Sequence, residues 1–133
     1  GSMWVCWYPV LKQQIISAHG NTSLTDEQIR DIHDAITFRS WPGLTFQLIG
    51  YIRERRRFER SRWLPAIEQT QVPIHISWAS DDCVAPVGIA NYLKDRVCPH
   101  AVLSVTRGLG HFCQIQDPAL WQQPLVKFWM SIL

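Results

Sequence analysis

The sequence has no apolar run long enough to cross a membrane. Its apolar start, MWVCWYPVL, ends at Lys12, well short of the roughly 20 residues that a transmembrane helix requires. This start also lacks a basic flank and a cleavage-like region, which argues against a secretory signal peptide. Gly1 and Ser2 precede a methionine and resemble a cloning remnant, so residues 1–3 are set apart from the fold. We predict a cytoplasmic protein without a membrane partner.

Paired cysteines and a strong net charge are also missing. The four cysteines, at positions 6, 83, 98 and 113, form no C-x-x-C pair and show no zinc-finger spacing. Free thiols in a reducing compartment are therefore expected, with no metal and no other cofactor. The net charge of +2 is too small to indicate a polyanionic partner by itself. With 47% hydrophobic and 18% charged residues, the composition is typical of a globular domain.

One stretch is strongly basic in spite of the small net charge. Six of the 13 basic residues lie within ten positions: Arg53, Arg55, Arg56, Arg57, Arg60 and Arg62. They could form a patch for nucleic acid or for an acidic partner. Alternatively, with Glu54 and Glu59 interleaved, they form a solvated helix face whose ion pairs contribute roughly 0.2–0.5 kcal/mol each. No aromatic stacking platform accompanies the arginines, so we favour the second interpretation and predict no nucleic-acid partner.

The first half of the chain has helical patterns only. Thr25 and Gln28 have the spacing of a capping box, in which each side chain binds the other residue's backbone N–H. The helix that follows has an apolar face formed by Ile29, Ile32 and Ile36. Pro42 suits the first turn of a second helix that continues into the arginine-rich stretch, and residues 63–69 predict a short third helix. Residues 24–70 therefore predict helices without strands.

After Val72-Pro73 the pattern changes to alternating strands and helices. Two β-like runs, IHISW (residues 74–78) and AVLSV (residues 101–105), enclose a stretch with helical spacing at residues 87–97. Asp117 and Pro118 then begin a last helix, whose apolar side comprises Trp121, Leu125, Phe128 and Ile132. Pro124 falls inside that helix and should kink or restart it. The order β-α-β-α predicts an α/β fold with a parallel sheet.

Two parallel strands are too few for a stable sheet. Parallel strands need neighbouring strands and two covered faces. Either the helical half provides unusual cover or further strands come from elsewhere, and we favour the second account.

Chemically useful side chains follow both predicted strands. Asp81 and Asp82 come directly after the first strand, and GLGH places His111 after the second. The carboxyl ends of parallel strands meet at one edge of the sheet, which is where α/β proteins place their active sites. One of the two carboxylates could then accept the Nδ1 proton of His111 and stabilise its imidazolium form during proton transfer.

These motifs resemble the C-terminal part of the α/β-hydrolase fold, in its haloalkane dehalogenase, epoxide hydrolase and esterase branch. That branch has W-G-x-x-D-x-x-x-P after its seventh strand, and Trp78–Pro86 reads WASDDCVAP. Alignment on Pro86 makes Asp82 the match to the catalytic acid. GLGH (residues 108–111) matches the family's G-x-G-H after the eighth strand, and HFCQIQDPALW, which begins with the same His111, resembles the run into the family's final helix. The stretch from YIRERRRFERSRWLPAI (residues 51–67) through VPIHISW (residues 72–78) resembles the mesoderm-specific transcript branch of this family.

The resemblance implies two regions and a reaction. Residues 4–70 correspond to a helical cap-like segment, and residues 71–133 to the C-terminal β-α-β-α part of the hydrolase core. It implies cofactor-free hydrolysis of an ester, an epoxide or a carbon–halogen bond, with His111 as general base and Asp82 as the residue that orients it. Ala79 and Cys83 depart from the family's usual glycine and proline, and neither change removes a proton-carrying group.

The family's nucleophile elbow has no counterpart here. No serine or aspartate among the 133 residues lies in a Gly-x-Ser-x-Gly or Gly-x-Asp-x-Gly motif. We therefore expect the chain to be inactive alone and to accept a small-molecule substrate only when a missing N-terminal half completes it. The alternative is a non-catalytic truncated derivative that acts as an oligomeric binding module, as a homo-oligomer or a domain-swapped dimer.

Other candidate side chains have simpler interpretations. Asp81 is expected to be a solvated loop residue. Cys113, two positions after His111, is expected to be a small buried residue and not a nucleophile. Three histidines outside the candidate site are expected to have structural roles: His33, His75 and His100.

Overall fold

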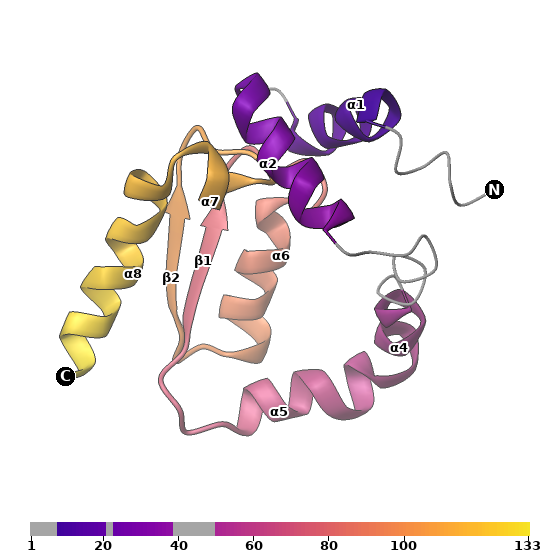
Figure 1. The fold of residues 1–133 in the computed structure, drawn as a ribbon. Helices are drawn as coiled ribbons and strands as arrows, with labels where there is room; N and C mark the ends of the chain where they lie inside the picture. Colours follow the sequence, from indigo (N-terminus) through magenta and orange to yellow (C-terminus); the bar gives the residue numbers. More distant parts are fainter. Residues whose placement is uncertain (1–7, 21–22, 39–49) are drawn as a thin grey trace.

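The computed structural model describes residues 8–20, 23–38 and 50–133, and it alternates strands and helices in its second half (Figure 1). The first half contains α1 (Tyr8–His19), α2 (Asp26–Thr37), α4 (Tyr51–Phe58), a π-helical turn (Glu59–Trp63) and α5 (Leu64–Gln69). The second half contains β1 (His75–Ala79), α6 (Val87–Tyr92), a second π-helical turn (Leu93–Val97), β2 (Val102–Thr106), α7 (Cys113–Gln116) and α8 (Pro118–Ile132). This order confirms the predicted α/β fold class, with a helical segment before a β-α-β-α unit.

The two strands form a parallel sheet, and both end at the same edge. His75 lies opposite Val102, and Ala79 lies opposite Thr106. Each strand begins and ends one residue later than its sequence pattern predicts. Within the described residues the sheet has no third strand. Each strand therefore has one unpaired edge, and the loops that follow both strands are neighbours.

The sheet is covered on both faces by helices (Figure 1). On one face a cluster of buried residues joins the strands to α6 and the turn after it: Ile76, Ala90, Cys98 and Ala101. Ala90 has no exposed surface, so its small side chain lets α6 approach β1 closely. On the other face lies α8, where Phe128 stacks on the His75 ring with 5.0 Å between ring centroids. This packing fixes β1 and the loop that follows it.

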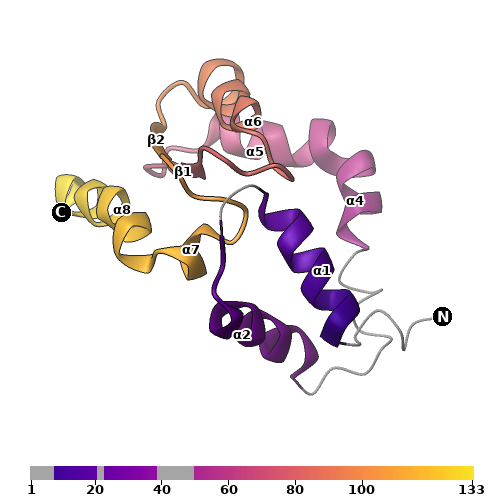
Figure 2. The same ribbon diagram turned by 90° about the horizontal axis from the view of Figure 1, so that it is seen from above.

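Helices α1 and α2 pack against each other above the carboxyl edge of the sheet (Figures 1 and 2). Their shared core comprises Leu11, Ile15, Ile29 and Ile32. The predicted capping box is present: Gln28 N–H donates to Thr25 Oγ1 at 3.1 Å, and Thr25 N–H donates to Gln28 Oε1 at 2.9 Å. Phe112 and Ile115 pack against the same core. The two helices therefore rest on the segment that contains His111.

Several boundaries differ from the sequence prediction. Helix α1 lies within residues 4–70, the segment predicted to be helical, but the patterns delimited no separate helix there. They also did not predict α7, which begins two residues after His111. Helix α8 runs continuously through Pro124 and does not restart there. Of its four predicted apolar positions only Phe128 is buried. The predicted helix start at Pro42 lies outside the described residues. No helix in the described ranges is both long enough and apolar enough to span a membrane.

Candidate active site

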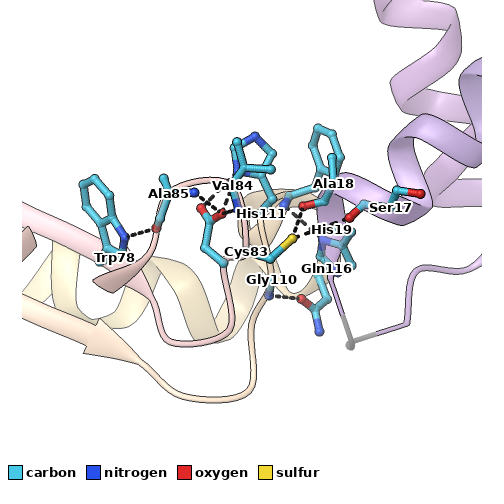
Figure 3. A network of polar contacts seen from close by, with 12 residues as sticks. Ser17, Ala18, His19, Trp78, Cys83, Val84, Ala85, Gly110, His111 and Gln116 are labelled. Atoms are coloured by element: carbon cyan, nitrogen blue, oxygen red, sulfur yellow. Dashed lines mark hydrogen bonds and ion pairs between the residues drawn. The ribbon is translucent and has the colours of Figure 1, made fainter. Parts of the chain in front are cut away.

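Asp82 and His111 meet where the two strands end. Asp82 lies in the loop after β1, and His111 lies in the loop after β2. His111 Nδ1 is 3.0 Å from Asp82 Oδ1 and 3.0 Å from Asp82 Oδ2 (Figure 3). Of the two carboxylates that the sequence left open, Asp82 is the one that binds His111. Asp81 is exposed and accepts a hydrogen bond from Ser80 Oγ at 2.6 Å.

The backbone of its own loop holds the Asp82 carboxylate. Oδ1 accepts the N–H groups of Val84 at 2.9 Å and Ala85 at 2.8 Å. The indole N–H of Trp78 donates to the Ala85 carbonyl at 2.7 Å, which ties the loop back to β1. Trp78, the first residue of the WASDDCVAP motif, thus holds the turn whose N–H groups orient the acid.

Asp82 remains ionised at neutral pH although its side chain is only 10% exposed. Burial alone would raise the pKa of this carboxyl. Hydrogen bonds from Ala85 N–H, His111 and Val84 N–H outweigh burial and hold the pKa below its ordinary value. An ionised carboxylate is an acceptor only, so Nδ1 of neutral His111 carries the proton and the ring's lone pair is on Nε2. This is the tautomer that a general base requires.

The two loops are also joined by backbone hydrogen bonds. Ser80 N–H donates to the Thr106 carbonyl at 2.9 Å, and Asp81 N–H donates to the Leu109 carbonyl at 2.9 Å. Gly108 N–H donates to Ser80 Oγ at 2.9 Å. Gly108 has φ of 76°, a left-handed conformation that glycine adopts without strain. These bonds set the separation of the loops, and so the distance between Asp82 and His111.

A hollow of about 210 Å³ opens beside the pair. It is lined by Ser77, Trp78, Ala79, Asp82, Ala85, His111, Cys113, Gln114 and Trp121. Cys113 is buried, as predicted, and burial raises the pKa of its thiol. A thiol with a raised pKa forms little thiolate at neutral pH, which makes Cys113 a poor nucleophile.

Two buried polar atoms of β1 are unsatisfied within the described residues. Ser77 Oγ and His75 Nδ1 have no hydrogen-bond partner there, whereas His75 Nε2 lies 2.9 Å from Ser104 Oγ. Buried polar groups without a partner are uncommon in native proteins. Ser77 also lines the hollow beside Asp82 and His111, so its hydroxyl group lies at the candidate site.

The end of α1 forms a third part of the site, which the sequence patterns did not predict. His19, the last residue of α1, is 1% exposed and contacts the histidine loop directly. A helix ending in His19-Gly20 is a recognisable C-terminal signal, because glycine readily adopts the left-handed conformation there, and Gly20 has φ of 88°. That signal locates the helix end. It does not say what the end contacts.

The arginine-rich segment is separate from this site. Arg55 pairs with Glu59 one turn later at 3.2 Å, and both side chains are well exposed. Arg57 and Arg62 lie over the Phe58 ring at 5.1 Å and 5.2 Å from its centroid. In the part of the chain that the structure describes, no group of three His, Cys, Asp or Glu side chains could hold a metal ion.

Comparison with known proteins finds one similar sequence in two strains of Mycobacterium tuberculosis, CDC 1551 / Oshkosh and ATCC 25618 / H37Rv. The protein is named "Putative hydrolase LipZ" in both strains. The chain resembles a hydrolase. It is 33% identical to LipZ over 76 residues, which is 57% of this chain and 26% of LipZ. The match thus spans about a quarter of the relative's length. No protein-family model and no solved structure matches the chain. The similarity supports a hydrolase-like function and is compatible with the resemblance to α/β-hydrolases.

Proposed function

We propose that the chain provides the C-terminal part of an α/β-hydrolase that acts on an ester, an epoxide or a carbon–halogen bond. The observation that carries this proposal is the pair of 3.0 Å contacts between His111 Nδ1 and the Asp82 carboxylate. In this proposal residues 4–70 form the cap-like segment and residues 71–133 contribute the acid and the base of the core.

In the proposed reaction His111 moves a proton and Asp82 stabilises the resulting charge. Nε2 of His111 accepts a proton from a serine nucleophile or from the water that hydrolyses the covalent intermediate. The Asp82 carboxylate, bound to Nδ1–H, stabilises the imidazolium while it exists. A serine nucleophile would give an acyl-enzyme, and an aspartate nucleophile would give an alkyl-enzyme ester.

The nucleophile must come from outside these 133 residues, which contain no elbow motif. The unpaired edge of β1 is where a further strand would add to the sheet. A parallel strand paired there would end at the same edge of the sheet as the loops that carry Asp82 and His111, and the elbow must lie at that edge to pass its proton to Nε2.

The test is a chimera in which the chain replaces the segment of LipZ that it matches. We expect the chimera to hydrolyse one class in a panel of p-nitrophenyl esters, epoxides and haloalkanes, and the chain alone to hydrolyse none. His111→Ala in the chimera should abolish turnover, because the base is lost. The matched control is His100→Ala, which changes a histidine of a turn far from Asp82. Equal turnover in the His111→Ala chimera and the unchanged chimera would contradict the proposal.

A second candidate function is a non-catalytic oligomeric module, and exposed apolar side chains of α8 favour it. Met130 is 70% exposed and Trp129 is 54% exposed, and both lie on the last turns of the helix. Contiguous exposed apolar surface of this kind promotes association.

We expect light scattering after size exclusion to give a mass near twice the chain's own 15.4 kDa. Met130→Glu should shift the peak towards the monomer, because a carboxylate would be buried in the contact. Gln123→Glu, which adds the same single negative charge at an exposed position of the same helix, is the control. A compact monomer at all concentrations would rule this candidate out.

A further inference from the structure

The last carbonyls of α1 are bound by the two loops that carry Asp82 and His111 (Figure 3). The final carbonyl groups of any helix lack partners within the helix and must find them elsewhere. Here the Cys83 thiol lies 3.2 Å from the Ala18 carbonyl and 3.5 Å from the Ser17 carbonyl. His111 N–H donates to the His19 carbonyl at 3.4 Å. The helix end therefore contacts both loops of the candidate site.

The His19 side chain makes the closest of these connections. Its Nδ1 accepts the backbone N–H of Phe112 at 3.0 Å, across 93 positions of the sequence. The two rings are stacked, with 6.0 Å between centroids and 24° between planes. The N–H groups of His111 and Phe112 are thus both bound by His19, one by its carbonyl and one by its ring.

Gln116 supports the same loop from its other side. Its Oε1 accepts Gly110 N–H at 2.9 Å, and its Nε2 donates to the Gly108 carbonyl at 3.2 Å. Gln116 also interacts with the His19 side chain. The backbone from Gly108 to Phe112, with His111 inside it, is therefore held by two side chains that contact each other.

The approach of α1 leaves no room for adjustment at Gly20. A Cβ at this position would lie 3.1 Å from the Asp81 carbonyl, and its φ of 88° is unfavourable for other residues. The end of α1 is therefore in close contact with the loop that contains Asp82, and this contact keeps His19 next to Phe112.

We propose that His19 is a positioning residue for His111, and that it fastens α1 to the histidine loop only while its imidazole is neutral. The assignment of a catalytic role to His111 rests on the proposed function. The fastening of the loop by His19 does not, because it can be measured without turnover.

Protonation breaks this contact for a chemical reason. Nδ1 accepts the Phe112 N–H through its lone pair, and an imidazolium has no lone pair at either nitrogen. The titratable groups near His19 are His111, whose imidazole disfavours a charge on His19, and Asp82, whose carboxylate favours it. The hydrogen bond with Gln116 also favours the charged form. Burial outweighs these contributions and lowers the pKa of His19 below 6.5.

The sign of the pH effect follows from that lowered pKa. Above about pH 6.5 both folded and unfolded states hold His19 neutral, and the contact contributes its full stabilisation. As pH falls below this value the unfolded state takes up the proton first, so the folded state loses stability. The contact is lost as the pH falls through the pKa of His19 in the folded protein. We therefore expect the histidine loop to come free of α1 on acidification.

Amide hydrogen exchange of the chain, followed by NMR from pH 7.5 down to the lowest pH at which the chain stays folded, tests this directly. After correction for intrinsic exchange, Phe112 N–H should lose about tenfold of its protection across that range, the equivalent of one hydrogen bond. Ser80 N–H, bound to the Thr106 carbonyl in the same pair of loops, should keep its protection and serves as internal control. Constant protection of Phe112 across the range, or parallel losses at Phe112 and Ser80, would overturn the proposal.

Two substitutions make the test specific for the acceptor at Nδ1. His19→Asn places a carbonyl oxygen near the Nδ1 position and does not titrate. It should therefore protect Phe112 N–H at neutral pH and abolish the loss in acid. His19→Gln places its oxygen near the Nε2 position, and should leave Phe112 N–H about tenfold less protected at every pH. Equal behaviour of the two variants would mean that His19 merely fills space.

Two measurements distinguish a failure of this proposal from a failure of the proposed function. They are the turnover of the LipZ chimera and the NMR resonances of the His111 ring. If the loop is released in acid but His111→Ala leaves turnover in the LipZ chimera unchanged, His19 positions a histidine that is not catalytic. If His111→Ala abolishes turnover but the His111 resonances respond identically to pH in wild type and His19→Asn, the proposed function stands and the role of His19 is wrong.

Discussion

The substitution Asp82→Asn is expected to lower turnover of the LipZ chimera by about 10⁴-fold, the loss seen when the carboxylate of a catalytic triad becomes an amide. Asparagine fits the same space, and its oxygen can still accept the N–H groups of Val84 and Ala85. Its NH₂ group, however, donates to His111 Nδ1 and moves the ring proton to Nε2. The base then has no lone pair facing a nucleophile, and no carboxylate stabilises its cation.

Asp81→Asn is the matched control for this experiment. It makes the same chemical change one residue away, on an exposed side chain whose hydrogen bond is to Ser80. We expect turnover within about twofold of the unchanged chimera, as for a surface position. The variants are compared by initial rates at saturating substrate, with hydrogen exchange at Ser80 showing that both loops are folded. A loss of less than tenfold in Asp82→Asn would mean that the carboxylate does not orient a base.

The residue types alone left the choice between the two aspartates open, and the family resemblance selected Asp82 through its alignment on Pro86. Asp82 is followed at two and three positions by Val84 and Ala85, whose N–H groups bind its own Oδ1. Such a turn depends on residues close in sequence, and Pro86 fixes where it ends. The strands were predictable for the same reason, because their apolar runs are short, continuous and bounded by polar loops. Each strand was nonetheless displaced by one residue, since strand ends depend on the partner strand.

Contacts between distant parts of the chain could not be predicted. Helix α1 lacks a clear apolar stripe, and it is stabilised because Leu11 and Ile15 pack against α2. Its last residue, His19, then meets Phe112, 93 positions later. The residues around His19 and those around Phe112 do not indicate that the two side chains will be in contact. Helix α8 shows the opposite case: its apolar pattern predicted a broad buried side, but only Phe128 is buried, because α8 packs on just two strands.

That narrow contact makes Phe128 the residue on which the packing of α8 depends. Its side chain is 8% exposed, and its ring stacks on His75 with an interplanar angle of 17°. We expect Phe128→Ala to lower the free energy of unfolding by about 3–5 kcal/mol, from lost burial and from the cavity left beside β1. The loss would be large for a chain of this size, whose whole stability is about 5–15 kcal/mol. Urea denaturation followed by circular dichroism measures it.

Trp129→Ala provides the control on the next residue of the same helix. The Trp129 side chain is 54% exposed, and its truncation should change the free energy of unfolding by less than about 1 kcal/mol in the monomer. Phe128→Ala has a second expected effect, because His75 loses the ring that covers it. Burial lowers the pKa of His75, so exposure should return that pKa towards 6.5. Equal destabilisation by the two substitutions, with His75 titrating unchanged, would show that α8 is not anchored through Phe128 and that the sheet face beneath it is covered in another way.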